Sequence, residues 1–114
     1  MSDKRPSKLA SLKTRATVFA ALGDETRLGV VGKLLSGEPQ SIARLTEGTQ
    51  LTRQAVTKHL RVLEHAGVVR SVRAGREALF ELKPAPIEDA RAYLERISRQ
   101  WDDALARLKA FAED

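Results

Sequence analysis

Residues 41–67 have the sequence SIARLTEGTQLTRQAVTKHLRVLEHAG, and this stretch decides the fold. Ser41 and Thr52 are residue types that cap helix N-termini with a side-chain oxygen, so each predicts the start of a helix. Gly48 and Gly67 are placed to end these helices, because glycine tolerates the left-handed conformation common after a helix C-terminus. The stretch therefore predicts two helices joined by a tight turn.

The second of these helices has two contrasting faces. Val56, Leu60 and Leu63 recur at helical spacing and form one apolar face. The opposite face is polar and basic, and no carboxylate occurs between Thr52 and Arg61. Glutamine and arginine form paired hydrogen bonds with base edges, and lysine binds phosphate, so this face suits the major groove of DNA. The alternative is an ordinary solvated helix face.

The segment after Gly67, residues 68–82, predicts a β-hairpin. Its first half is rich in β-branched valines, and its second half alternates apolar and polar residues. The tip is expected at residues 73–76, which include Gly75 between basic residues. Helix-turn-helix and hairpin together predict a winged helix that binds DNA. The candidate DNA-binding residues are Thr52, Arg53, Gln54, Thr57, Lys58, Arg61, Arg73 and Arg76.

Two segments, GDETRL at residues 23–28 and LTRQAVTKHLRVLEHAGVV at residues 51–69, resemble the ArsR family of bacterial winged-helix repressors. The resemblance covers roughly residues 17–110, and it implies a homodimer that binds operator DNA and represses transcription. Many members of that family sense metals through a Cys-x-Cys pair before the recognition helix. Here residues 41–45 are SIARL and the chain has no cysteine, so we predict a metal-independent regulator without a cofactor.

The domain organisation follows from these elements. We predict a basic tail at residues 1–7 and a single winged-helix domain at residues 8–112, mainly α with a small hairpin wing. The tail is expected to be disordered, or else to act as an arm that enters a minor groove. Before the helix-turn-helix, a helix is expected at residues 8–22. A second is expected from Asp24 to Leu35, with its inner side formed by Leu28, Val31 and Leu35.

The last predicted helix, residues 86–112, carries a sustained heptad pattern of apolar residues. A helix this long on a small domain needs a partner surface. We expect it to form a dimer interface with the N-terminal helices, and packing onto its own domain is the alternative. The candidate interface residues are Leu12, Phe19, Ile87, Leu94, Ile97, Trp101 and Leu108.

The net charge of +5 is unevenly distributed along the 114 residues. Residues 1–22 and residues 51–83 each carry a net charge of +4, which indicates an anionic partner for these regions. DNA is favoured over an acidic membrane surface, because the basic helix lacks the aromatic residues that membrane binding favours. We expect no membrane span and no signal peptide, and therefore a cytoplasmic protein.

The sequence contains no recognisable catalytic constellation, so we predict that the chain is not an enzyme. His59 and His65 are six residues apart, whereas two ligands on one helix face need a spacing of three or four. His59 is expected to be a hydrogen-bonded structural residue. Acidic residues of the last helix are expected to be solvated, namely Glu88, Asp89, Asp102 and Asp103.

The sequence leaves three alternatives open. The winged helix could serve protein interaction or RNA binding instead of DNA binding. The regulator could respond to an unknown small-molecule effector. Tyr93 and Trp101 could line a ligand cavity in a dimer, although aromatic residues at helical spacing more often belong to a core.

Overall fold

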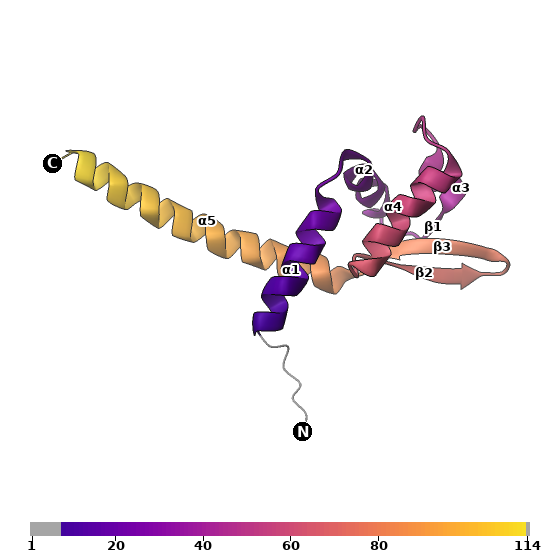
Figure 1. Cartoon of the computed structure of the whole chain (residues 1–114), viewed down its shortest axis with the longest axis horizontal. Helices are drawn as coiled ribbons and strands as arrows, with labels where there is room; N and C mark the ends of the chain where they lie inside the picture. Colours follow the sequence, from indigo (N-terminus) through magenta and orange to yellow (C-terminus); the bar gives the residue numbers. More distant parts are fainter. Residues whose placement is uncertain (1–7, 114) are drawn as a thin grey trace, which may run out of the picture.

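The structure is a computed structural model, and it describes residues 8–113 of the chain (Figure 1). The predicted basic tail at residues 1–7 lies outside the described residues. The elements in order are α1 (Lys8–Leu22), α2 (Glu25–Leu34), β1 (Gln40–Ser41), α3 (Ile42–Thr46), α4 (Arg53–His65), β2 (Val69–Ala74), β3 (Glu77–Leu82) and α5 (Pro84–Glu113). The prediction of a mainly α winged helix-turn-helix is confirmed.

Three helices begin where a side-chain oxygen caps their first turn. Asp24 accepts a hydrogen bond from the backbone N–H of Arg27 at 3.1 Å and so starts α2. Ser41 caps α3 and Thr52 caps α4 in the same way, each through the N–H three residues on. Each cap satisfies a backbone donor that has no partner within its helix. All three capping residues were predicted correctly.

The core lies where α1, α2, α3, α4 and the sheet meet. The predicted apolar face of α4 is confirmed, since Val56, Leu60 and Leu63 are fully buried. The contribution of α1 comes from Val18 and Ala21, which the sequence pattern did not single out. The other members of this core cluster are Val30, Leu34, Leu45, Ala66, Val68, Val69 and Phe80.

The predicted inner side of α2 holds for Val31, which packs against the core, but is wrong for Leu28 and Leu35. Leu28 is 55% exposed and Leu35 is 68% exposed, and α2 ends at Leu34 with Leu35 as its C-cap. Val30 and Leu34 are the buried residues instead, with Val31 partly buried beside them. Residues 28–35 hold apolar side chains on more than one face of the helix. The periodicity was therefore compatible with two apolar stripes. The position of the neighbouring elements decides that the stripe with Val30 and Leu34 is the buried one.

The sheet has three antiparallel strands in the order β1-β3-β2. The hairpin β2–β3 was expected, and its tight turn is at Gly75, whose φ of +66° is easily adopted by glycine. Strand β1 was not expected, because two residues carry no alternation pattern. It pairs Gln40 with Phe80 and Ser41 with Leu79, so the start of α3 is held against the wing.

Helix α5 is 30 residues long and extends far beyond the rest of the domain (Figure 1). It begins at Pro84, earlier than the predicted residue 86, because proline is well tolerated in the first turn of a helix. Helix α1 crosses its N-terminal half. Among residues 8–113, no helix combines the length and the apolar character that crossing a membrane requires.

The crossing of α1 and α5 is held by a polar and aromatic cluster. The Arg15 guanidinium donates to both carboxylate oxygens of Asp89, at 2.7 and 3.0 Å, and lies 4.7 Å from the centre of the Tyr93 ring. Phe19 packs against Tyr93 with ring centres 6.2 Å apart. The expectation that Asp89 is merely solvated is therefore wrong. Its partner is 74 residues away in the sequence, which no local pattern can reveal. Glu88 is exposed, as expected, and forms a surface ion pair with Arg91.

This ion pair predicts a specific dependence of stability on pH. The hydrogen bonds from Arg15 hold the pKa of Asp89 below its ordinary value. A carboxylate with a lowered native pKa stabilises the fold above its unfolded pKa, and that contribution is lost as the pH falls through the native pKa. Asp89→Asn should therefore lower the denaturant midpoint modestly at pH 7, and the difference from wild type should vanish in acid.

Denaturant unfolding of both proteins across a pH series measures this effect. Asp102→Asn is the matched control, because Asp102 lies on the same helix and has no ion-pair partner among the described residues. A deficit for Asp89→Asn that stays unchanged from neutral pH down to the most acidic pH at which the wild type still folds would argue against an electrostatic contribution.

Candidate nucleic-acid interface

The exposed face of α4 is positioned by the buried face of the same helix. With Val56, Leu60 and Leu63 in the core, the side chains of Arg53, Gln54, Lys58 and Arg61 lie at the surface, and that of Thr57 is partly buried. The threonine hydroxyls are partly committed to the backbone. Thr57 Oγ1 donates to the carbonyl of Arg53 at 2.7 Å, and Thr52 Oγ1 accepts from the Ala55 N–H. Thr57 is therefore left with its methyl group and an acceptor lone pair for any ligand.

A groove of about 840 Å³ separates α4 from the wing. It brings together residues from α3, α4 and β3 that are far apart in the sequence, because β1 ties α3 to β3. The lining residues are Ser41, Ile42, Ala43, Arg53, Gln54, Thr57, Lys58, Arg76, Glu77 and Ala78. Five of the eight predicted DNA-binding residues thus border one groove, and the other three lie outside it.

The remaining predicted residues lie around this groove. Thr52 is exposed at the N-terminus of α4, and Arg73 is exposed on β2 opposite Ala78. Arg61 borders a different groove, between α1 and α4. The start of α3 was missed as part of the site, namely Ile42 and Ala43. The Ser41 cap was the available signal, because it marks a helix start, but only the β1–β3 pairing places that start beside α4.

The charges of this surface are mainly positive. Arg53, Lys58 and Arg76 border the groove, and Glu77 is its one carboxylate. Arg70 is neutralised by Glu81 at 2.7 Å across the hairpin, whereas Arg73 and Arg76 have no ion-pair partner among the described residues. An exposed polar helix flanked by cationic side chains on a hairpin can bind a phosphate backbone while the helix contacts bases.

Comparison with known proteins identifies this architecture. Residues 22–72 match a family described as "Helix-turn-helix domain". The chain is 30% identical over 97 residues to the HTH-type transcriptional regulator Rv2034 of Mycobacterium tuberculosis, covering 85% of this chain and 87% of that protein. It is 38% identical to an ArsR-like transcriptional regulator from Rhodococcus sp. RHA1, with a TM-score of 0.74 and coverage of 90% of this chain and 95% of that one. This chain belongs to the ArsR family. It is a DNA-binding transcriptional regulator with a winged helix-turn-helix fold.

A further solved structure, described as that of a possible ArsR-family transcriptional regulator, shares the fold at lower identity. It is a solution structure from Mycobacterium bovis, described as a homodimeric winged helix-turn-helix DNA-binding domain, with 20% identity and a TM-score of 0.64. The match covers 94% of this chain and 95% of that domain. This structure supports the fold alone, whereas the relatives from M. tuberculosis and Rhodococcus confirm the predicted resemblance to the ArsR family and its regulatory function.

Helix α5 of this ArsR-family chain exposes a long apolar stripe. Leu94 is 52% exposed, Trp101 is 63% exposed and Phe111 is 81% exposed. The stripe also includes Ile97, Leu105 and Leu108, and Leu12 on α1 is likewise exposed. The sequence analysis missed Leu105, because the heptad pattern placed Ala104 at the interface position between Trp101 and Leu108. These side chains have no covering element among the described residues.

Two of the residues predicted for a dimer interface have partners within the chain. Ile87 packs against the domain's own core, and Phe19 packs against Tyr93. Trp101 was expected to belong to a core rather than to a ligand cavity, and it is exposed in the single chain. The candidate interface therefore centres on the part of α5 that follows Tyr93.

Proposed function

We propose that this chain binds operator DNA as a homodimer and represses transcription by occluding the operator. The observation that carries the proposal is the groove between α4 and the wing, where Arg53, Gln54, Thr57 and Lys58 of one helix meet Arg76 of the hairpin. Gln54 and Arg53, with Thr57 beside them, are assigned to bases. Lys58, Arg61, Arg73 and Arg76 are assigned to phosphates, and Thr52 to the start of the recognition helix.

The homodimer is supported by the exposed stripe on α5. Stable monomers seldom leave a contiguous row of large apolar side chains in solvent. A second copy of α5 would bury this row, because the same heptad face occurs on both subunits. The homodimeric protein from M. bovis has the same fold. A two-fold dimer would present two copies of α4 to successive major grooves.

A binding assay with the chain's own upstream DNA tests the proposed function. Labelled DNA from the region before its gene should be retained at lower protein concentration than scrambled DNA or RNA of equal length. A specific complex forms typically 10³ to 10⁷ times more tightly than a non-specific one. Equal affinity for RNA, or no preference over scrambled DNA, would favour the alternatives of an RNA-binding or protein-interaction module. Loss of reporter expression in the presence of the protein distinguishes repression from activation.

We place the protein in the cytoplasm, where it has access to bacterial DNA, and we assign it no catalytic activity. Its relatives are named as transcriptional regulators, and the surface that contains its polar side chains suits a polyanion. The lining of the groove between α4 and the wing contains no nucleophilic side chain that is hydrogen-bonded to a general base.

We expect metals to leave operator affinity unchanged. The chain has no cysteine, so soft ions lack the thiolate ligands that they prefer. Its two histidines, His59 and His65, are six residues apart on α4, a spacing that does not place two ligands on one helix face. Gel shifts with zinc, cadmium or arsenite at low micromolar concentration should give the same midpoint as gel shifts without metal. A loss of affinity of about tenfold, reversed by a chelator, would reveal a metal site.

A further inference from the structure

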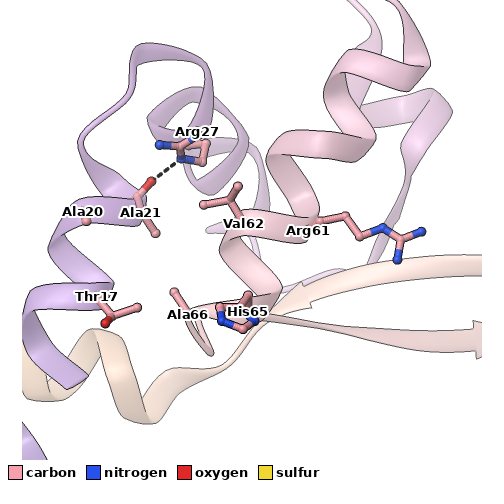
Figure 2. Close-up of a pocket in the computed structure, with 8 residues that line it drawn as sticks. All are labelled: Thr17, Ala20, Ala21, Arg27, Arg61, Val62, His65 and Ala66. Carbon is pink, nitrogen blue, oxygen red and sulfur yellow. Dashed lines mark hydrogen bonds between the residues drawn. The ribbon is translucent and has the colours of Figure 1, made fainter. Parts of the chain in front are cut away.

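A second groove lies on the other side of α4, between this helix and α1 (Figure 2). Its volume of about 530 Å³ is in the range of sites that bind small molecules. Figure 2 shows Val62 pointing into it from α4, with Ala20 and Ala21 opposite on α1 and Ala66 below. Because these side chains are short, the space between the two helices stays open.

The ionisable side chains of this groove are all of basic types. Its eight lining residues include Arg27, Arg61 and His65 but no carboxylate. Figure 2 shows Arg61 extending away from α1, which leaves Arg27 and His65 at two ends of the apolar wall. A ligand with an apolar body and a negatively charged group complements this arrangement. A cationic ligand would meet Arg27 with no acidic partner in the groove.

Arg27 also connects the helices on both sides of the groove. Its Nε donates to the carbonyl of Ala21 at 2.5 Å, at the end of α1. A second guanidinium nitrogen lies 3.1 Å from Nδ1 of His59 on α4, so the predicted structural role of His59 is confirmed. Asp24 also approaches His59, at 3.7 Å. A negatively charged ligand that binds the Arg27 guanidinium therefore perturbs the contact that links α1 to α4, the proposed recognition helix.

The groove is separate from the apolar stripe of α5. Arg15 and Phe19 contact α5, whereas Thr17 and Ala21 border the groove. Thr17 follows Arg15 by two residues, and Ala21 follows Phe19 by two residues, which is about 200° around a helix. The groove is thus on the opposite side of α1 from α5. A second copy that covers the α5 stripe does not thereby fill the groove, which favours a small molecule as its occupant.

We propose that this groove binds a small apolar carboxylate, and that its occupancy lowers the affinity of the chain for operator DNA. Val62 and His65 belong to the same helix as Gln54 and Lys58. A ligand between α1 and α4 therefore changes the position of α4 relative to the rest of the domain. Ligand binding and DNA binding are coupled when the ligand binds one position of α4 more tightly than the other, and the coupling is reciprocal. The ligand site itself does not depend on which bases α4 contacts.

Methyl NMR of the full-length protein with octanoate tests the site. Saturable shifts are expected at the methyl groups of Ala20, Ala21, Val62 and Ala66, which line the groove. Octylammonium has the same chain and the opposite charge, so it should leave these signals in place. Ala20→Trp fills the groove from an exposed position and should abolish the shifts. Ala106→Trp makes the same change at an exposed alanine of α5 and should leave them intact.

The same ligand is then added to the DNA-binding assay. Octanoate should weaken operator binding of wild type and Ala106→Trp by about fivefold or more, and should leave Ala20→Trp unaffected. Equal shifts with octylammonium, shifts confined to α5, or intersubunit contacts to the Ala20 methyl group would overturn the ligand site. Saturable groove shifts without any change in operator affinity would overturn the regulatory part. Failure of the chain to bind DNA at all would refute the proposed function, and the NMR titration would still decide the ligand site.

Discussion

Leu94→Asp should convert a dimer into a folded monomer. Leu94 is exposed in the single chain and belongs to the apolar stripe of α5 that we assign to the second subunit. An unpaired carboxylate buried there costs on the order of several kcal/mol or is forced into its neutral form. A two-fold interface repeats the substitution on both subunits. Sedimentation at micromolar concentration should show a dimer for wild type and a monomer for the variant.

The control for this experiment is Ala106→Asp. Ala106 is also exposed on α5, but it lies on the side of the helix away from the stripe, about 160° from Leu108 at 100° per residue. It should therefore leave the dimer intact while introducing the same charge and a loss of helix propensity at least as large. Circular dichroism should show that Leu94→Asp keeps its helices, because Leu94 is not part of the domain's own core. A monomeric wild type, or a dimeric Leu94→Asp, would refute the proposed interface.

Gln54→Ala and Arg76→Ala should impair DNA binding in different ways. Loss of a bidentate contact from Gln54 should cost about 1–3 kcal/mol per contact and relax the preference at one base pair of each half-site. Arg76→Ala should weaken binding to all sequences alike. It should also reduce the slope of log affinity against log salt by about one unit per phosphate contact. In a homodimer each substitution is present in both subunits, so each loss of contact occurs at both half-sites.

Binding to the operator and to scrambled DNA across a salt series separates the two effects. The half-site centres are expected about 10 base pairs apart, one helical turn. Arg99→Ala is the matched control for Arg76→Ala, because Arg99 is an exposed arginine on α5, away from the groove. It should leave the salt slope nearly unchanged. If Gln54→Ala keeps full specificity while Arg76→Ala changes it, the assignment of helix to bases and wing to backbone is wrong.

The sequence by itself determined the elements that depend on near neighbours. Ser41 and Thr52 cap helices through backbone groups three residues away, so their roles are visible in a short window. Val56, Leu60 and Leu63 predicted the buried side of α4 because they form the main apolar stripe of that helix, and Val62 is the one large apolar side chain outside it. With one face buried, the exposed face of Arg53, Gln54 and Lys58 followed directly.

Only the tertiary structure decided the features that join distant segments. The two residues of β1 carry no pattern, and they become a strand because β3 offers an unpaired edge. The pairing of Arg15 with Asp89 requires α1 to cross α5. On α2, apolar residues occur on several faces, so the packing of neighbouring elements chose Val30 and Leu34 over Leu28 and Leu35. Local hydrogen bonds and a single apolar face are encoded in short windows, whereas the choice between equivalent faces depends on long-range packing.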